Sequence, residues 1–287
     1  MKVRKELKAE CLYYVDYSLT VEDVIEAYEN QFTLTGYVIK IDEEARVLKV
    51  VLGDGIIAEL PWEESTIQPL VIKHPETTNV PDQVAYLKCK VIRIKVKAIL
   101  GKKIILSRKD NMLEAWKEIV SKPKQHVFYG AYLNTNKSGT MIFYDIGEGI
   151  TAACNIFEFT ECRVDVKSWM KYSEIHELCI SKLDKHEITV SRKKACKKTY
   201  EDFKTCDILN VKIGKPVYNP ETNELEGYHV EVNAKVDAIA DLPQSKKKYK
   251  YGTIVRAAVR KVKPFRPKSE GGPTMSLEIL DIWCMIM

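Results

Sequence analysis

Long apolar runs are missing from this sequence of 287 residues. A helix that crosses a membrane needs about 20 consecutive apolar residues, and no stretch of the chain approaches that length. The first ten residues, MKVRKELKAE, are charged throughout and lack the apolar centre of a secretory leader. We therefore expect a cytoplasmic protein with no membrane partner.

Paired cysteines are missing as well. The chain has eight cysteines, and no two of them form a Cys-x-x-Cys pair, so the spacings of zinc ribbons and thioredoxin-like motifs are absent. His176, Cys179 and His186 lie within eleven residues of one another, but a zinc site of this kind usually needs a fourth ligand and tighter pairing. Free thiols in a reducing compartment explain the cysteines better, and we expect no metal.

Motifs of common enzyme chemistry are also lacking. There is no glycine-rich phosphate loop, no Gly-x-Ser-x-Gly elbow and no His-Glu-x-x-His motif. Acidic pairs such as 43–44 and 63–64 suit turns and surfaces. Active sites can assemble from distant residues, but the sequence favours a protein that is not an enzyme, needs no cofactor and takes no small-molecule substrate.

The chain does contain enough apolar material for two or three compact domains. Hydrophobic residues make up 45% of it, including 15 Tyr, 7 Phe and 4 Trp, so each domain can bury a core. Charged residues reach 30%, yet the net charge is only +5. This mildly basic balance suits a groove that follows phosphates, and it is also common among ordinary cytosolic proteins.

An internal repeat is the most informative feature. Three glycines of a first copy recur 94 positions later in a second copy, and IILSRK (104–109) recurs 84 positions later as ITVSRK (188–193). Blocks that recur in the same order indicate copies of one small unit. The matched residues are Gly36, Gly53, Gly55, Ser107 and Trp116 in the first copy, and Gly130, Gly147, Gly149, Ser191 and Tyr200 in the second.

Each copy predicts strands joined by short helices. VLKVVL (47–52) and TMIFYD (140–145) are β-branched and aromatic runs that end at a Gly-x-Gly turn. Residues 84–99 alternate apolar with basic side chains, which predicts a strand with one dry face and one basic face. Apolar residues at helical spacing predict short helices after Thr20, near 111–120 and near 195–203. A third, divergent copy fills the C-terminal part, with its own alternating run near 229–243.

These features resemble the S-one RNA-binding repeat of the large ribosomal small-subunit protein and its relatives in phages and mobile elements. The resemblance rests on Gly-x-Val at 36–38, the Gly-x-Gly turns, and an Ile-x-Leu-Ser-x-Lys strand followed by Trp. It covers two copies and extends weakly to the C-terminus. It implies an all-β fold with short linker helices, built of tandem five-stranded OB-fold barrels, that binds RNA or the ribosome and has no catalytic activity.

The chain departs from this family at the positions that stack bases. In the family a Phe usually precedes the Gly-x-Gly turn and a His follows it. The residues at these two positions are Val47 and Ala58 in the first copy, Met141 and Ala152 in the second, and His229 and Ala240 in the third. The resemblance therefore implies the barrel fold more strongly than it implies base stacking.

The repeats also predict the domain boundaries. We expect a lead-in segment with a short helix at 1–30, a first barrel at 31–112, a helical linker at 113–124, a second barrel at 125–194, a linker at 195–206 and a third, divergent barrel at 207–287.

A basic tract near the C-terminus is the first candidate for RNA contact. From Leu242 to Ser269 there are ten Lys or Arg and no Asp or Glu, with Tyr and Phe interleaved. Clustered cations bind phosphates, and aromatic rings among them stack bases. Lysines that protect strand edges give a similar pattern, but ten cations without an acid exceed that need. The candidates here are Lys246, Lys247, Lys248, Tyr249, Lys250, Arg256, Arg260 and Arg266.

A second set of candidates lies in the first two copies. Basic residues of the alternating strand would form a stripe on one face, although an ordinary solvent-facing strand gives the same pattern. Of two successive aromatic residues in the second copy one should point outward, where it either stacks on a base or is covered by a neighbouring barrel. The candidates are Lys88, Lys90, Arg93, Lys95, Lys97, Arg108, Lys109, Phe143, Tyr144 and Arg192.

Together these patterns favour a non-catalytic RNA-binding protein of translation or RNA handling, from a bacterium, a phage or a mobile element. Binding would be mainly electrostatic, with weak sequence preference. Single-stranded RNA is the expected partner, and the ribosome or another ribonucleoprotein is a wider one. The alternative is a protein-docking module made of barrels that lost their stacking residues. Salt dependence separates the two, because phosphate contacts weaken steeply with ionic strength.

Overall fold

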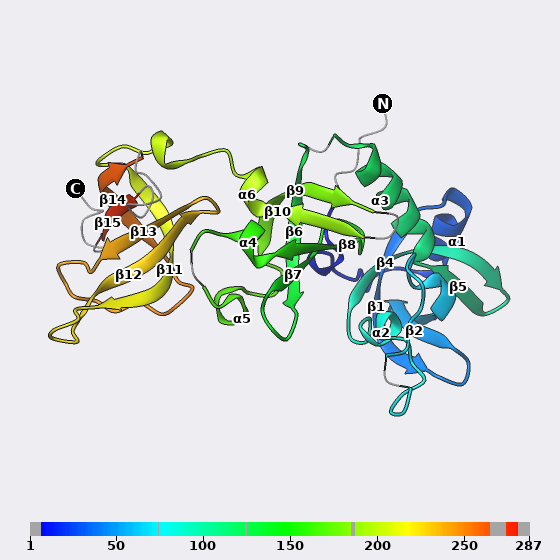
Figure 1. Ribbon diagram of the computed structural model, residues 1–287. Coiled ribbons are helices and arrows are strands. Elements are labelled where there is room, and N and C mark those ends of the chain that lie inside the picture. Colours follow the sequence, from blue (N-terminus) through cyan, green and yellow to red (C-terminus); the bar gives the residue numbers. More distant parts are fainter. Residues whose placement is uncertain are drawn as a thin grey trace. The chain divides into compact units, whose positions relative to one another are not determined.

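The fold consists of three closed five-stranded barrels joined by short helices, seen here in a computed structural model (Figure 1). The structure describes residues 7–73, 75–123, 125–162, 164–184, 187–264 and 274–280. None of the helices in this described part is long and apolar enough to cross a membrane.

Barrel 1 follows a lead-in segment that contains a single 3-10 turn and helix α1. Its strands are hydrogen-bonded in the order β1-β2-β3-β5-β4, and β1 pairs with β4 to close the barrel. The elements are η1 (Glu10–Leu12), α1 (Val21–Asn30), β1 (Thr33–Asp42), β2 (Val47–Gly53), β3 (Ile56–Pro61), η2 (Trp62–Glu64), α2 (Asp82–Ala85), β4 (Val91–Leu100) and β5 (Lys103–Ser107).

Barrel 2 begins after helix α3 (Lys109–Ser121) and has the order β10-β8-β7-β6-β9, closed by β9 against β10. Written from its first strand, the order is β6-β7-β8-β10-β9, which corresponds to β1-β2-β3-β5-β4 in barrel 1. The elements are β6 (Val127–Thr135), β7 (Met141–Asp145), β8 (Thr151–Asn155), α4 (Ile156–Phe159), α5 (Val166–Trp169), β9 (Ile175–Leu183), β10 (Ile188–Ser191), α6 (Arg192–Ala195) and η3 (Tyr200–Asp202).

Barrel 3 repeats the order once more, as β11-β12-β13-β15-β14. Its third and fifth strands run parallel, as do those of barrel 1, while its other strand pairs are antiparallel. The strands are β11 (Ile208–Tyr218), β12 (Leu225–Asn233), β13 (Val236–Asp241), β14 (Ile254–Lys263) and β15 (Thr274–Ile279). A closed five-stranded barrel in this order is an OB fold, so the expected fold class is confirmed.

The chain divides into two compact units, and the division passes through barrel 2. Unit 1 contains residues 1–131, 144–152 and 184–187, and unit 2 contains residues 132–143, 153–183 and 188–287. Barrel 1 therefore lies wholly in unit 1 and barrel 3 wholly in unit 2. The predicted domain boundaries remain a prediction.

The apolar cores explain why the repeated glycines are needed. Val38, Leu48 and Val50 are fully buried in barrel 1. A Cβ on Gly36 would lie 2.4 Å from Cγ1 of Val50, so the first strand can approach the second only without a side chain there. Gly55 has a φ of +69° at the β2–β3 turn, a conformation that glycine adopts without strain.

Two predicted helices are confirmed, and one is shorter than expected. Thr20 caps α1 in a capping box with Asp23, and α3 covers the predicted 111–120 segment. In the 195–203 linker the chain forms only α6 and η3, each of a single turn.

The prediction of a single strand over residues 84–99 is partly wrong. Residues 82–85 form α2, turns follow, and β4 begins only at Val91. The first half of β4 is buried on both sides, because the barrel interior covers one side while η1, α1 and α3 pack against the strand.

Candidate nucleic-acid interface

The basic stripe predicted on β4 is not an open surface. Lys88 is exposed and Lys90 is half-buried, but Arg93 and Lys95 are buried. The Lys95 Nζ lies 2.5 Å from a carboxylate oxygen of Glu114 on α3. Lys97 is exposed, but its Nζ lies 2.5 Å from Glu64. The expectation of one basic face is therefore wrong for Arg93 and Lys95, because acids from other elements neutralise them.

Arg108 is the most deeply buried of the predicted cations. Its guanidinium donates to both carboxylate oxygens of Glu10, at 2.7 to 3.2 Å, and to the backbone oxygen of Ser65 at 2.8 Å. Only 7% of its side chain and 8% of the Glu10 side chain are exposed. Arg108 thus fixes the lead-in segment to barrel 1 and is not available to a phosphate.

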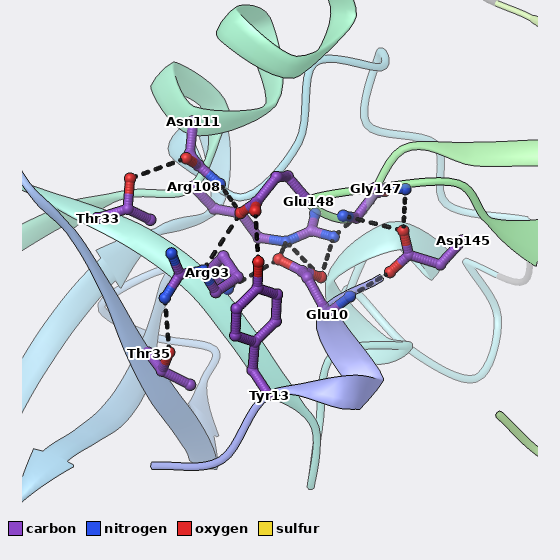
Figure 2. Close-up of polar contacts among 11 residues, drawn as sticks. Glu10, Tyr13, Thr33, Thr35, Arg93, Arg108, Asn111, Asp145, Gly147 and Glu148 are labelled. Carbon is purple, nitrogen blue, oxygen red and sulfur yellow. Dashed lines mark hydrogen bonds and ion pairs between the residues drawn. The ribbon is translucent and has the colours of Figure 1, made fainter. Parts of the chain in front are cut away.

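Figure 2 shows that this ion pair belongs to a larger buried network within unit 1. Arg93 donates to Glu148 at 3.2 Å and to the hydroxyl of Thr35 at 2.8 Å. Glu148 also accepts hydrogen bonds from Asn111 at 2.7 Å and from the Tyr13 hydroxyl at 2.9 Å. The network therefore ties the lead-in segment, β4 and the Gly147-Glu148-Gly149 turn together.

Asp145 completes the network at its other end (Figure 2). One carboxylate oxygen accepts the N–H of Glu10 at 2.7 Å, and the other accepts those of Gly147 and Gly149 at 2.9 and 3.2 Å. Three acids, Asp145, Glu10 and Glu148, face two arginines here. Burial, and then the charge of Glu10, raise the pKa of Asp145 to about 7.

We expect this carboxyl group to make unit 1 less stable as pH rises. The folded state holds a proton on Asp145 up to about pH 7, whereas the unfolded chain releases it near pH 4, so the free energy of unfolding falls across this window. The measurement is urea unfolding at several pH values for the wild type and Asp145→Asn. The stability difference between them should shrink as pH rises. Asp54→Asn, at an exposed position, is the matched control, and a pH-independent difference for Asp145→Asn would contradict the assignment.

Arg192 lies in a second buried cluster, within unit 2. Its guanidinium lies 2.8 Å from Glu231, a residue of β12, and 5.0 Å from the centre of the Phe159 ring. Glu231 also accepts a short hydrogen bond from Thr160. Arg192 therefore joins α6 to barrel 3 and, like Arg108, pairs with an acid inside the protein. Lys109, at the start of α3, is half-buried.

Neither of the two aromatic candidates of barrel 2 is a fully exposed ring. Tyr144 is fully buried and Phe143 is half-buried on β7. The sequence predicts that one of the two rings points outward. Phe143 is the less buried of the two, and Tyr144 cannot reach a base.

The positions at which the family carries its stacking His face inward here. Ala58, Ala152 and Ala240 are all at most 1% exposed and belong to the barrel interiors. The outward positions of the third strand are their neighbours, such as Ile57 of barrel 1 and Ile239 of barrel 3, which are 54% and 44% exposed.

The outer face of barrel 1 carries a mixture of charges. Lys49 and Lys103 both bind Glu59, at 2.6 and 2.7 Å, which neutralises much of their charge. Tyr37, next to Val51 across the β1–β2 pair, shares a hydrogen bond with Cys89 that raises the pKa of the Tyr37 hydroxyl. This face offers little excess positive charge for a phosphate chain.

Barrel 3 presents an exposed ring on the strand face that OB folds use for nucleic acids. His229 lies exposed on β12, opposite Ile239 of β13. Ile239 in turn pairs with Ser276 of β15, which pairs with Lys261 of β14. His229 is the one family stacking position that keeps a ring. The family resemblance predicts this position, but His229 is not among the predicted RNA contacts.

The loop between β13 and β14, residues 242–253, carries a basic surface of barrel 3. We call it the lysine loop. Its four lysines are all exposed, and no carboxylate among the described residues lies within ion-pair distance of them. The members are Lys246, Lys247, Lys248 and Lys250.

The backbone of the lysine loop is held in place by unit 2. The N–H of Tyr249 donates to the hydroxyl of Tyr228 at 2.9 Å, and the Tyr249 ring packs against the core of barrel 3. The hydroxyl of Tyr251 accepts the N–H of Asp165 at 2.6 Å, and Gly252 donates to Ile213 at 2.8 Å. The loop therefore presents its lysines from a fixed frame.

The remaining cations of barrel 3 differ in their surroundings. Arg256 and Arg260 are exposed on β14, and Arg260 forms a close ion pair with Glu278. Arg266 lies outside the described residues.

Comparisons with known proteins add little to this geometry. No protein-family model and no curated protein matches the chain. Among solved structures, it is similar to a multidomain protein with nucleic acid binding domains from Streptococcus pneumoniae, with 13% identity, 85% of this chain and 72% of that chain covered, and a TM-score of 0.27. It is also similar to Drosophila Unr CSD456, with 9% identity, 87% and 98% covered, and a TM-score of 0.19. Scores this low carry no argument, so the OB fold rests on strand order alone.

The cysteines and histidines form no metal site in the described part of the chain. His176 is buried beside Glu174, with Nε2 3.3 Å from the carboxylate, and Cys179 is also buried. His186 lies outside the described residues.

Proposed function

We propose that this protein binds single-stranded RNA without catalysing a reaction, and that barrel 3 makes the main contact. The observation that carries the proposal is the lysine loop, whose four exposed lysines have no carboxylate partner in the described part of the protein. Several other candidate cations are neutralised by an acid. They are Arg93, Lys95, Lys97, Arg108, Arg192 and Arg260.

The physical case is electrostatic. Each phosphate that a lysine neutralises releases condensed counterions, which favours binding at low salt. The acids on the strands of barrel 3, such as Asp241 and Glu278, lie outside the lysine loop. The loop is therefore the part of barrel 3 best suited to a phosphate chain.

His229 supplies a reason for single strands to be preferred. An exposed ring can stack on a base only when that base is unpaired. Ile239, beside His229, adds apolar surface on the same face. A role in translation, on a ribosome or another ribonucleoprotein, rests on the S-one resemblance.

Reversing the charge of the lysine loop is expected to weaken RNA binding at least tenfold. The variant is Lys246→Glu, Lys247→Glu, Lys248→Glu and Lys250→Glu, and the measurement is fluorescence anisotropy of a labelled single-stranded RNA at low and near-physiological salt. If four phosphates are bound, log affinity should fall with log salt with a slope of about −3, and the variant should flatten that slope.

The matched control makes the same charge change at scattered exposed lysines: Lys40, Lys102, Lys117 and Lys204. If binding depends only on net charge, both variants lose affinity equally, and the assignment to the lysine loop is wrong. Absent or salt-insensitive binding by a folded sample would overturn the proposal itself. A single-stranded DNA of equal sequence shows whether the ribose contributes.

His229→Ala is expected to cost about 1 kcal/mol of RNA binding, roughly fivefold in affinity, because a stacked ring is lost. His229→Phe, which keeps a ring on the same exposed strand position, should retain the affinity. The same anisotropy titration measures both. Equal losses for the two variants would show that His229 does not stack on a base.

The alternative function, protein docking, is favoured by a different surface, the exposed face of α1 in unit 1.

A further inference from the structure

Helix α1 exposes an apolar face that nothing in the described structure covers. Val24 and Ala27 pack inward and are 0% and 2% exposed. Val21, Ile25 and Tyr28, spaced four and three residues apart, are 51%, 41% and 38% exposed, and this spacing places them on one side of the helix. Phe32, just beyond the helix, is 54% exposed and extends the row. We call these four residues the α1 face.

The helix that carries the α1 face is firmly positioned. The Thr20–Asp23 capping box fixes its first turn, with hydrogen bonds of 2.7 to 3.2 Å. At its other end Gln31 adopts a φ of 55°, and Phe32 donates its N–H to Ala27 at 2.9 Å. A ten-residue helix is marginal by itself, so these caps and the packing of Val24 hold the apolar row in place. The face is therefore preformed.

The charged residues of the chain segment that carries the α1 face all have one sign. From residue 9 to residue 39 the sequence contains no Lys or Arg. The helix carries four exposed acids, and Asp16, also exposed, precedes it. The helix acids are Glu22, Asp23, Glu26 and Glu29. An apolar row on a segment whose only charged residues are acids is unusual in a chain whose net charge is +5.

The acidic charge of α1 favours some binding partners of the α1 face over others. Acids repel a phosphate chain and an anionic membrane surface. A symmetric pair of identical copies would bring the same acids together. A polypeptide with an apolar stripe bordered by Lys or Arg complements both features of the face.

We propose that the α1 face docks a basic amphipathic segment of a partner protein. The apolar side chains of that segment would cover Val21, Ile25 and Tyr28, and its cations would meet the acids of α1. The proposal does not depend on RNA binding, which concerns barrel 3 in unit 2. It gives the protein a site on unit 1 through which it can join a larger assembly.

The test uses the full chain and a labelled synthetic peptide of Leu and Lys in which leucines recur at helical spacing. We expect micromolar binding, measured by fluorescence anisotropy, and no binding of a peptide with Glu in place of Lys. A scrambled peptide of the same composition should bind at least tenfold more weakly. Equal binding of the scrambled peptide would overturn the proposal, because charge alone would then explain the attraction.

Two pairs of variants locate the site. Ile25→Glu with Tyr28→Glu, at exposed positions, should weaken peptide binding at least tenfold. The matched control is Leu113→Glu with Val120→Glu, two α3 residues that are 39% and 44% exposed, and it should leave binding unchanged. Equal losses from both pairs would overturn the assignment to α1. Sedimentation of the protein alone tests whether a second copy of the chain covers the α1 face. A dimer that Ile25→Glu disrupts would show that it does, and this result would also overturn the proposal.

Discussion

Replacing Arg108 by Met is expected to lower the free energy of unfolding of unit 1 by about 3–5 kcal/mol. The substitution leaves the buried Glu10 carboxylate without its cation, while Asp145 and Glu148 remain nearby in the same network. The methionine cannot donate the hydrogen bonds that Glu10 and the Ser65 carbonyl now accept. A buried charge left in this way is among the most costly single changes in a protein.

Urea unfolding followed by hydrogen exchange measures this loss separately for each unit, because a chain with several domains need not unfold in one step. Arg46→Met is the matched control. It breaks an ion pair to Glu63 in which both side chains are more than 60% exposed, and it should cost at most about 1 kcal/mol. Adding Glu10→Gln to Arg108→Met should restore part of the stability. A loss below about 1 kcal/mol for Arg108→Met would show that the buried network does not support unit 1.

Replacing Phe159 by Ala is expected to destabilise unit 2 by about 3–5 kcal/mol. The Phe159 side chain is fully buried at the end of α4. Its ring meets the edges of Trp169 and His176 with centroids 5.9 and 5.6 Å apart, and it lies beneath the Arg192 guanidinium. Removal of the ring leaves a cavity between these groups and deprives Arg192 of its aromatic neighbour.

The same short helix supplies the control. Phe157, two residues earlier, is 79% exposed, so Phe157→Ala should change stability by no more than about 0.5 kcal/mol. Both variants are compared by urea unfolding with hydrogen exchange in unit 2. Similar values for Phe157 and Phe159 would mean that Phe159 is not part of a packed core.

The fold was predictable because its signals are local and repeated. Gly36 and Gly130 mark first strands, the Gly-x-Gly pairs mark the turn after the second strand, and the Ser-Arg-Lys blocks mark the end of the fifth. These residues are required by the local backbone conformation and by the close approach of neighbouring strands. Both depend mainly on the few residues around them. The Thr20 cap was predictable for the same reason.

The candidate site was predictable only in part. The sequence located the lysine loop because its cations have no acid nearby in the chain, and the structure has none beside them in the described residues either. It overestimated the β4 stripe because alternation gives the direction of a side chain and not what covers it. The predicted contacts do not include His229, although the family resemblance places it at a stacking position.

The sequence by itself therefore determined the repeat, the glycine-marked turns and the acid-free tract of barrel 3, since each depends on neighbours along the chain. Only the tertiary structure decided which cations remain open. Glu10 lies 98 residues before Arg108, and Glu148 lies 55 residues after Arg93. Folding buries these charges away from water, and a buried charge must pair with an opposite charge. No local pattern in the sequence specifies which distant acid pairs with each arginine.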